Sequence, residues 1–310
     1  MMKIRHIQSA SEINQDQDTV LVLGYFDALH KGHQALFKRA KTIAQAQGLK
    51  VVVLTFYESP KLAFVRFEPD LLNHITYPEL RLKRFADLGV DELYLTSFTT
   101  AFSKMSARDF INDYIRPLKA RSIVVGFDYK FGRDQADASY LSENFSGEVI
   151  EVPEVSLGGQ KVSSSRIRQL IRQGDVAETN HLLGFTLSTR GLVVHGDARG
   201  RTIGFPTANL APLDRTFIPA DGVYVTDVKI GQQTYRAMTS IGKNVTFGGT
   251  ELRMEANIFD FNREIYGETI EIYWLDKIRD MTKFDGVDGL VCQLKKDKAI
   301  AKIWKDTQKN

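Results

Sequence analysis

Two histidines open a predicted helix near the N-terminus of the chain. In the segment LVLGYFDALHKGHQALFKRA a strand leads through Gly24 into that helix, and His30 and His33 stand at its start. A spacing of three places both imidazole rings on one face, beside the unpaired N–H groups and the positive dipole end of the helix. The pattern predicts a phosphate-binding site, although two polar residues at a helix entrance explain it about equally well.

A second predicted helix begins in the segment VSSSRIRQLIRQGD. Ser164 and Ser165 are suitable N-caps, Gly174 is a stop signal, and Arg166 and Arg168 lie in the first turn. Basic residues at that end oppose the helix dipole, whereas a bound triphosphate would gain from the dipole, the hydroxyl groups and the guanidinium groups together. An anion site therefore explains the placement better than a capped surface helix, which remains the alternative.

A glycine-rich stretch, GLVVHGDARGRTIGFPTANL, ends in two polar residues with a fixed spacing. Its four glycines within 20 residues are too many for one uninterrupted strand and suit loops that pass close to phosphates. Thr207 and Asn209 are two residues apart, so in an extended segment both side-chain oxygens point to the same side. Such oxygen ligands suit Mg²⁺. The alternative is a strand that begins with proline and carries two outward polar residues.

Glu255 lies in a segment, ELRMEANIFDF, in which apolar and polar residues alternate. Leu252, Met254, Ala256 and Ile258 share one face of the predicted strand, and Glu255 lies on the other. A positioned carboxylate can accept the proton of an alcohol that attacks a phosphate. Most strand glutamates are only solvated surface. The spacing alone does not decide between these two interpretations.

The elements that must position these residues differ between the two halves of the chain. In the first half, short apolar runs alternate with segments of helical periodicity, which predicts βαβ units in a doubly wound parallel sheet with its ligand crevice beyond the carboxyl ends of the strands. From about Thr189, strands of period two are joined by a tight Gly231-Gln232 turn, which predicts an antiparallel barrel. An apolar stripe over 287–304 predicts a closing helix. We place the domain boundary between residues 1–184 and 185–310.

Composition narrows the class of protein. The 310 residues, 43% hydrophobic and 25% charged, suffice for two cores, and the net charge of +3 indicates neither a nucleic-acid face nor a membrane-surface patch. Cys292 is the only cysteine, which excludes an intramolecular disulfide and a multi-cysteine zinc site. No run of 18 apolar residues occurs. We expect a cytoplasmic enzyme without a nucleic-acid or membrane partner, whose metal is held by oxygen; the oligomeric state stays open.

The first two motifs together resemble those of the HxGH nucleotidyltransferase superfamily, and GYFDALHKGH with VVGFDYKFG at 124–132 is similar to its FMN adenylyltransferase branch. The resemblance implies that His30 and His33 contact ATP phosphates and stabilise charge while the α-phosphorus is attacked. It implies that Ser164, Ser165 and Arg168 hold the leaving pyrophosphate. The resemblance also implies that the nucleotide is bound by Gly24, Phe26, Asp27 and Gly32. It implies that the flavin is bound by Asp128 and Phe131. An acid just before a helix is often a cap or turn residue, so we interpret Asp27 as mostly structural.

The glycine-rich stretch is similar over its whole length to the flavokinase signature, and GVYVTDV, SIGKNVTF, MEANIFDF and EIYGETIEI follow in the order of that family. The resemblance implies that Thr207 and Asn209 hold Mg²⁺ with ATP and that Glu255 is the general base. The implied phosphate loop is shaped by Gly196, Gly200, Arg201 and Gly204. Nearly the whole chain thus resembles the bacterial bifunctional riboflavin kinase/FMN adenylyltransferases, or FAD synthetases. That resemblance implies riboflavin, FMN and ATP as substrates and FMN and FAD as products.

Two other functions stay open, the first of them because the chain departs from the adenylyltransferase pattern at Ser59 and in the loop after Phe131. The chain reads TFYESP where the family has TF-x-PHP, so Glu58 and Ser59 stand in place of proline and histidine. The first alternative is a riboflavin kinase with a weakened adenylyltransferase domain. The second is a non-catalytic flavin-binding regulator, which the retained histidines and Glu255 disfavour.

Overall fold

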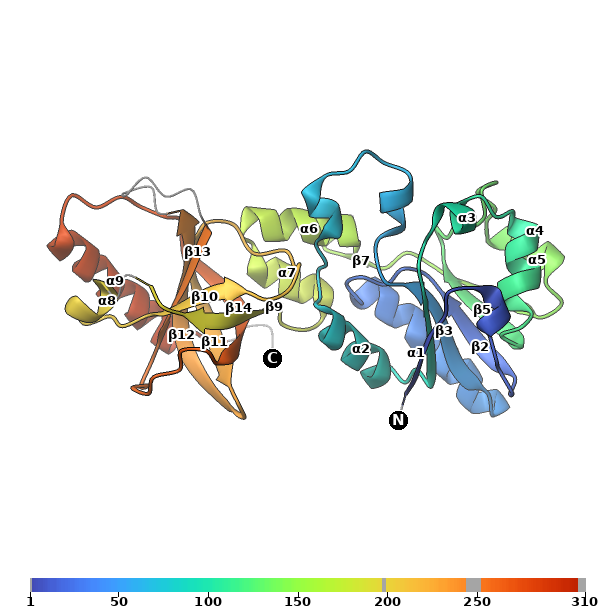
Figure 1. The fold of residues 1–310 in the computed structure, drawn as a ribbon, viewed down its shortest axis with the longest axis horizontal. Coiled ribbons are helices and arrows are strands. Elements are labelled where there is room, and N and C mark those ends of the chain that lie inside the picture. The colour runs from blue at the N-terminus through green and yellow to red at the C-terminus, as the bar shows by residue number, and fades with distance from the viewer. Residues whose placement is uncertain (1, 197–198, 244–251, 306–310) are drawn as a thin grey trace. The chain divides into compact units, whose positions relative to one another are not determined.

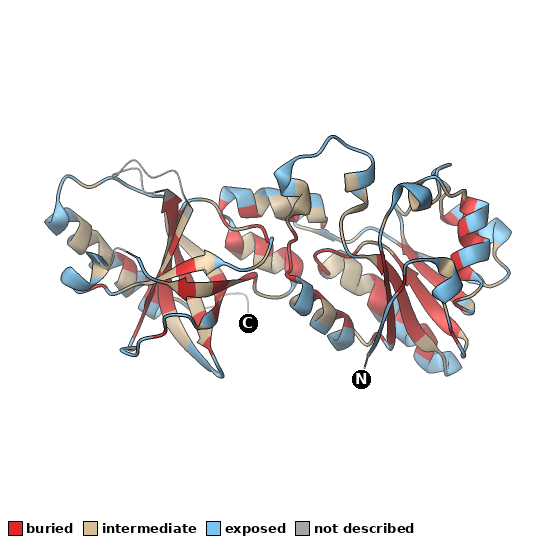
Figure 2. Cartoon of the chain, in the orientation of Figure 1, coloured by how far each residue is buried: buried red, intermediate tan, exposed pale blue. Residues whose placement is uncertain are grey.

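The computed structural model describes residues 2–196, 199–243 and 252–305 (Figure 1). The chain divides into two compact units. The first consists of Met1–His74 and Pro78–Ser164, and the second consists of Ile75–Tyr77 and Ser165–Asn310. Each unit has its own kind of sheet and its own hydrophobic core, and the buried residues lie mainly on the strands and on the inner sides of the helices (Figure 2).

The described residues of the first unit form a six-stranded sheet in which all neighbouring strands are parallel. Its strands are β1 (Lys3–His6), β2 (Thr19–Leu23), β3 (Lys50–Phe56), β4 (Glu92–Thr96), β5 (Ala120–Gly126) and β6 (Glu148–Val152). Their order in the sheet is β1-β4-β3-β2-β5-β6. Valine and leucine fill the central strands because both faces are covered, as is usual in parallel sheets, and every residue of β2 is buried.

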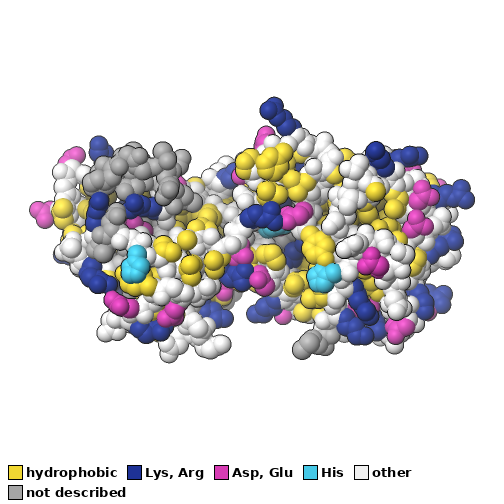
Figure 3. All heavy atoms as spheres, viewed as in Figure 1, with side chains coloured by type: hydrophobic (Ala, Val, Ile, Leu, Met, Phe, Trp, Pro, Cys, Tyr) yellow, Lys and Arg dark blue, Asp and Glu magenta, His cyan; other side chains and the backbone are white. Residues whose placement is uncertain are grey.

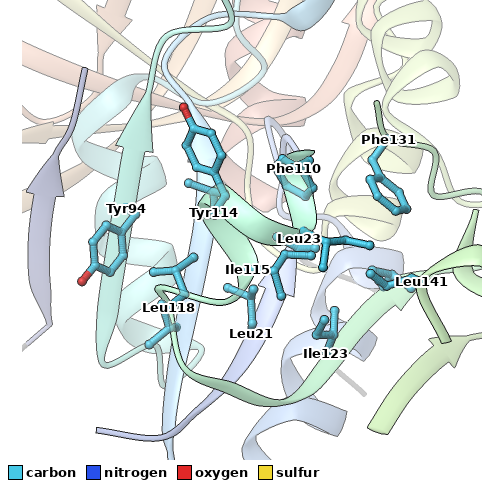
Figure 4. Packing of buried hydrophobic residues seen from close by; sticks show 14 of the residues in the cluster. Leu21, Leu23, Tyr94, Phe110, Tyr114, Ile115, Leu118, Ile123, Phe131 and Leu141 are labelled. Carbon is cyan, nitrogen blue, oxygen red and sulfur yellow. The ribbon is translucent and has the colours of Figure 1, made fainter. Parts of the chain in front are cut away.

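Helices cover both faces of this sheet. They are α1 (Lys31–Gln47), α2 (Pro78–Asp87), α3 (Thr100–Ser103), α4 (Ala107–Phe110) and α5 (Ala138–Asn144), with shorter turns η1 (Ala10–Glu12), η2 (Pro60–Ala63), η3 (Pro69–Leu72) and the π-helical η4 (Ile111–Ile115). Alternate residues of a strand point to opposite faces. Val20 and Val22 belong to the cluster formed with α1 and α2, whereas Leu21 and Leu23 belong to the cluster formed with α4, η4 and α5 (Figure 4). The predicted doubly wound parallel sheet is confirmed.

The second unit contains, within the described residues, a closed antiparallel barrel of six strands. The strands are β9 (Ser188–Val194), β10 (Ala208–Pro212), β11 (Gly222–Ile230), β12 (Gln233–Lys243), β13 (Leu252–Ile258) and β14 (Thr269–Arg279). The barrel closes in the order β10-β13-β12-β11-β14-β9. The predicted turn joins β11 to β12: Gly231 has a φ of 59°, and Ile230 pairs with Gln233. The predicted antiparallel barrel is confirmed.

Helices flank this barrel, and a small hairpin precedes them in the chain. The helices are α6 (Ser164–Gln173), α7 (Val176–Leu183), α8 (Arg199–Thr202) and α9 (Val287–Ile303), and the hairpin of the first unit is β7 (Ser156–Leu157) with β8 (Gln160–Lys161). The α9 residue Ala301 is fully buried in a cluster with Phe205, Val225 and Met238. The predicted closing helix is therefore present and packs on the barrel.

Helices α6 and α7 contact the barrel through specific hydrogen bonds. Asn180 Nδ2 donates to the Trp274 carbonyl oxygen at 2.7 Å, and its Oδ1 accepts from the Leu187 N–H at 2.7 Å. The Ile171 carbonyl oxygen accepts from the Ala220 N–H at 3.1 Å. These contacts explain why α6 and α7 are counted with the barrel in the second compact unit. Apart from Ile75–Tyr77, that unit begins at Ser165, twenty residues before the domain boundary that the sequence predicts.

The distribution of charged side chains on the surface agrees with the nearly equal numbers of basic and acidic residues in the sequence. On the face shown in Figure 3, basic and acidic side chains are both spread over each unit. None of the helices in the described part of the chain combines the length and the apolar character that a membrane crossing needs.

A buried ion pair ties α9 to the barrel and yields a stability prediction. The Asp297 side chain is fully buried, and Arg279 of β14 donates to its carboxylate from Nε at 3.0 Å and from Nη2 at 2.8 Å. In Asp297→Ala the guanidinium loses its carboxylate partner, so we expect the free energy of unfolding to fall by about 3 kcal/mol or more. Chemical denaturation followed by barrel tryptophan fluorescence measures it. Lys295→Ala, an exposed change on the same helix, is the control, and equal stabilities of the two variants would contradict the prediction.

Candidate active sites

The structure brings His30 and His33 together at the start of α1. His30 is the N-cap, and its Nδ1 accepts a hydrogen bond from the His33 backbone N–H at 3.2 Å. The two imidazole rings are stacked, with centroids 3.7 Å apart and an angle of 13° between their planes. Because Nδ1 of His30 accepts, the proton of a neutral ring lies on Nε2. His30 can therefore donate from Nε2 to an anion at the helix end.

The turn before α1 has a backbone conformation that few residue types adopt. Phe26 and Leu29 have positive φ angles of 55° and 47°, although neither is glycine. A Cβ on Gly24 would lie 2.5 Å from the Phe26 ring, and one on Gly32 would lie 3.0 Å from the His30 ring. The Phe26 ring in turn meets His33 edge-on, with centroids 5.1 Å apart. The predicted glycines and Phe26 thus fix the directions of the two imidazole rings.

Burial shapes the electrostatics of His33. Its pKa is held well below the usual value for histidine, first by burial and then by electrostatic repulsion, since an added proton on His33 would be repelled by the neighbouring titratable ring of His30 and by the Arg81 guanidinium. Its Nδ1 atom is buried and has no hydrogen-bond partner among the described residues. At neutral pH the ring is therefore uncharged, with a buried polar atom that a ligand could satisfy.

A buried cluster surrounds Asp27. The Asp27 side chain is 1% exposed, and its Oδ1 lies 3.6 Å from His74 Nδ1. The other ring nitrogen of His74 lies 3.2 Å from Glu58 Oε2, and the Tyr25 hydroxyl lies 3.3 Å from His74 Nδ1. These contacts agree with a structural role for Asp27, and its nucleotide contact stays a prediction. Glu58, which stands in place of a family proline, is part of this cluster.

Two buried residues of this region, His74 and Arg81, were missed by the sequence patterns. Arg81 lies on the inner side of α2, one turn before the buried Phe85, and is 6% exposed. A basic residue within an apolar helical stripe was the available signal, because such a residue is seldom buried without a specific partner. His74 follows the turn η3 and carried no comparable signal.

The other residues predicted for adenylyl transfer differ in their burial, in their contacts and in the unit to which they belong. Ser164 ends the first unit, whereas Ser165 and Arg168 are counted in the second, where the Arg168 guanidinium lies 5.7 Å from the Phe217 ring centroid. Exposed Asp128 forms an ion pair with Lys161 at 2.7 Å. Phe131 is buried in the core beside Phe110 and Leu141 (Figure 4). Their contacts with pyrophosphate and flavin stay predictions.

In the barrel, the structure brings Thr207, Asn209 and Glu255 together. Asn209 on β10 pairs directly with Glu255 on β13, and Thr207 Oγ1 lies 3.4 Å from Glu255 Oε2. Asn257 supports the start of β10, because its Nδ2 donates to the Pro206 carbonyl oxygen at 2.6 Å. A hydroxyl, an amide and a carboxylate therefore lie side by side where β10 begins.

The predicted glycines pass close to this group. A Cβ on Gly196 would lie 2.3 Å from Asn209 Nδ2, and one on Gly200 would lie 2.2 Å from the Phe205 carbonyl oxygen and 3.5 Å from Thr207 Oγ1. Gly204 has a φ of 80°. Arg201 is exposed, and its guanidinium lies 4.0 Å from Glu264. Residues 197–198 between these glycines, and the second half of the SIGKNVTF motif at 244–247, lie outside the described residues.

Comparison with known proteins matches both halves of the chain. The family model described as FAD synthetase matches residues 12–166, and the model described as riboflavin kinase matches residues 183–305. The first range contains His30 and His33, and the second contains Thr207, Asn209 and Glu255. Arg168 lies two residues beyond the first range.

Individual proteins match nearly the full length. A bifunctional riboflavin kinase/FMN adenylyltransferase of Listeria monocytogenes is 41% identical over 288 residues, which are 91% of each chain. The protein of that name from Bacillus subtilis is 35% identical over 308 residues, 97% of each chain. A crystal structure described as a macrolide-efflux protein from Streptococcus pneumoniae is 54% identical, with a TM-score of 0.94 over 98% of this chain and all of that one.

The lowered pKa of His33 predicts a pH dependence of stability. Histidine in the unfolded chain titrates near 6.5, above the folded value, so below about pH 6.5 the unfolded chain binds the additional proton. The free energy of unfolding of the wild type should therefore fall, relative to His33→Gln, by up to about 1.4 kcal/mol per pH unit as the pH drops, and the difference should be constant above about pH 7. Chemical denaturation between about pH 5 and 8 tests this, and parallel curves would contradict it.

Proposed function

Because the chain belongs to the family of bifunctional riboflavin kinase/FMN adenylyltransferases, we propose that it phosphorylates riboflavin to FMN and then adenylylates FMN to FAD, with ATP as co-substrate in both steps. The observation that carries the proposal is that the chain holds two polar groups of different chemistry: stacked histidines with a neutral His33, and a hydroxyl beside a carboxylate. We assign adenylyl transfer to residues 1–184 and phosphorylation to residues 185–310. Cys292 is exposed and unpaired, which fits the reducing cytoplasm that we propose as its location.

In the kinase step, the terminal hydroxyl of the ribityl chain attacks the γ-phosphorus of ATP. A bond forms between that oxygen and phosphorus, the bond to the bridging oxygen breaks, and ADP leaves. An alcohol is a weak nucleophile, so Glu255 accepts its proton as the new bond forms. The 3.4 Å contact with Thr207 and the pairing with Asn209 hold the carboxylate beside the phosphate loop.

Magnesium is the metal that the donor set fits. Thr207 and Asn209 supply neutral oxygens beside the Glu255 carboxylate, and hard oxygen donors are what Mg²⁺ prefers. The described residues contain no group of three or more His, Cys, Asp or Glu side chains that could hold a metal. We propose that Thr207 and Asn209 hold Mg²⁺ together with ATP, where the ion would neutralise charge on the phosphates.

In the adenylyl step, a phosphate oxygen of FMN attacks the α-phosphorus of the second ATP. The bond to the bridging oxygen breaks and pyrophosphate leaves. Since the nucleophile is already an anion, the step needs positioning and charge stabilisation but no strong base. His30 and His33 donate to the phosphate oxygens as charge develops, and Ser164, Ser165 and Arg168 hold the pyrophosphate. Asp128 and Phe131 contribute to the flavin site.

The alternative function, a riboflavin kinase with weakened adenylyl transfer, is not favoured, because both family models match and the named relatives are bifunctional. Glu58 stands in place of a family proline and contacts His74, so the segment that supplies a histidine in the family is engaged differently here. The efflux description belongs to the pneumococcal protein, and neither family model supports it for this chain.

Product chromatography decides between these functions. Riboflavin, ATP and Mg²⁺ should give FMN first and FAD afterwards. Accumulation of FMN alone would favour the weakened adenylyltransferase. Binding of flavin without any product would identify a non-catalytic regulator.

Glu255→Gln is expected to abolish FMN formation from riboflavin while FAD formation from supplied FMN continues. The amide keeps the shape of the side chain but cannot accept the proton. Separate assays with riboflavin and with FMN measure the two steps. Asp260→Asn, which removes an exposed carboxylate next to the end of the same strand, is the matched control. Loss of both activities in a folded Glu255→Gln variant would refute separate centres.

His33→Ala is expected to reduce FAD formation by about 100- to 1000-fold, because one donor to the transition state is lost. FMN formation by the same protein should be unchanged. His181→Ala, a histidine of α7 outside both centres, serves as the control. Wild-type FAD formation by His33→Ala would remove His33 from the adenylyl step.

A further inference from the structure

Arg81 is a buried cation whose position needs a physical reason. It lies in the middle of α2, and only 6% of it is exposed. Burial lowers the pKa of its guanidinium, whereas the neighbouring Tyr25, Asp27 and Glu58 raise it. Taking such a charge out of water costs several kcal/mol unless its donors are matched by acceptors. An apolar residue would fill the same place in the helix without that cost.

The Arg81 donors meet acceptors on two different strands of the sheet. Nε donates to the Phe26 carbonyl oxygen at 3.2 Å, and Nη1 donates to the Phe56 carbonyl oxygen at 2.9 Å. Nη2 donates to Thr55 Oγ1 at 2.9 Å and also to the Tyr25 carbonyl oxygen. Tyr25 and Phe26 follow β2, while Thr55 and Phe56 end β3. One guanidinium therefore joins the carboxyl ends of two adjacent parallel strands.

Phe26 connects Arg81 to the histidine pair, because it contacts both α2 and His33. The Phe26 ring contacts Phe85, which lies one turn after Arg81 on α2, with centroids 6.1 Å apart. The same ring meets the edge of His33 at 5.1 Å. Helix α2 thus holds the Phe26 backbone through Arg81 and the Phe26 side chain through Phe85. Phe26 needs this support, because its φ of 55° is unfavourable for a residue with a side chain.

We propose that Arg81 is a positioning residue for adenylyl transfer, which fixes the Tyr25–Phe26 turn and thereby the direction of the His33 ring. The inference rests on the proposed function of the first unit. Arg81 does not need to touch the substrate for this role. An error of about 1 Å in a group that contacts the transition state can lower the rate about 100-fold.

The positioning role and a merely structural role predict different kinetics. In Arg81→Ala we expect kcat for FAD formation from FMN to fall about 100-fold, with the KM for ATP changed less than about threefold. Arg81→Lys keeps the charge and some of the donors, and should recover about a tenth of the wild-type kcat or more. FMN formation by the second unit should stay at the wild-type value in both variants. Lys83→Gln, an exposed change on the same helix, should change neither activity.

Chemical rescue adds a readout that a loss of stability would not give. Arg81→Ala leaves space for a guanidinium ion, so millimolar guanidinium chloride should raise its rate of FAD formation severalfold, whereas urea at the same concentration should not. A variant that is only destabilised would lose activity in guanidinium.

Each possible result bears on the proposal. A wild-type protein that makes no FAD from FMN would overturn the proposed function itself. A wild type that does so, with a folded Arg81→Ala equally active or impaired only in KM, would overturn the role of Arg81 alone. Should Arg81→Ala not fold, the same comparison rests on Arg81→Lys, and unchanged kcat in that variant would count against the proposal.

Discussion

Phosphate binding by groups that carry no full charge depends on their directions being fixed before the ligand arrives. A neutral imidazole or a hydroxyl gains little from a distant anion, so its contribution depends on hydrogen-bond geometry. Both centres achieve this geometry through very close packing of backbone against side chain. Around α1, Gly24 and Gly32 leave room for the Phe26 and His30 rings, and in the barrel Gly196 leaves room for Asn209. The glycines are therefore needed because a Cβ at their positions would push these polar and aromatic side chains out of place.

The two centres differ in the way that the two proposed reactions require. The barrel centre includes a carboxylate, Glu255, in contact with a hydroxyl group, which suits a nucleophile that must lose a proton. The first centre presents stacked imidazoles, and the Asp27 carboxylate in the turn before them is buried against His74. Such a centre suits a nucleophile that is already an anion. The difference follows from side chains on two unrelated sheets.

The sequence was informative where function depends on neighbours along the chain. The pairing of His30 with His33 follows from helical spacing, and the common side of Thr207 and Asn209 follows from strand geometry. The contact of Glu255 with Thr207 could be expected only from family resemblance, since 48 residues separate them. Arg81 was missed because its acceptors, mostly backbone carbonyl oxygens, lie after β2 and at the end of β3, and such acceptors have no sequence signature. The attachment of α6 and α7 to the barrel depends in the same way on one amide side chain, Asn180, and backbone groups of β14 and the segment before β9.

The two sheets also differ in how they end. In the described part of the chain, each barrel strand pairs with a neighbour on both sides, whereas the parallel sheet ends at β1 and β6. Every residue of β1 is exposed, and its alternate residues Lys3 and Arg5 approach Glu92 of the adjacent strand at 3.9 and 3.3 Å. Positive side chains along such an edge discourage the addition of a foreign strand. At the β1 edge, resistance to the addition of a foreign strand therefore comes from one lysine and one arginine side chain.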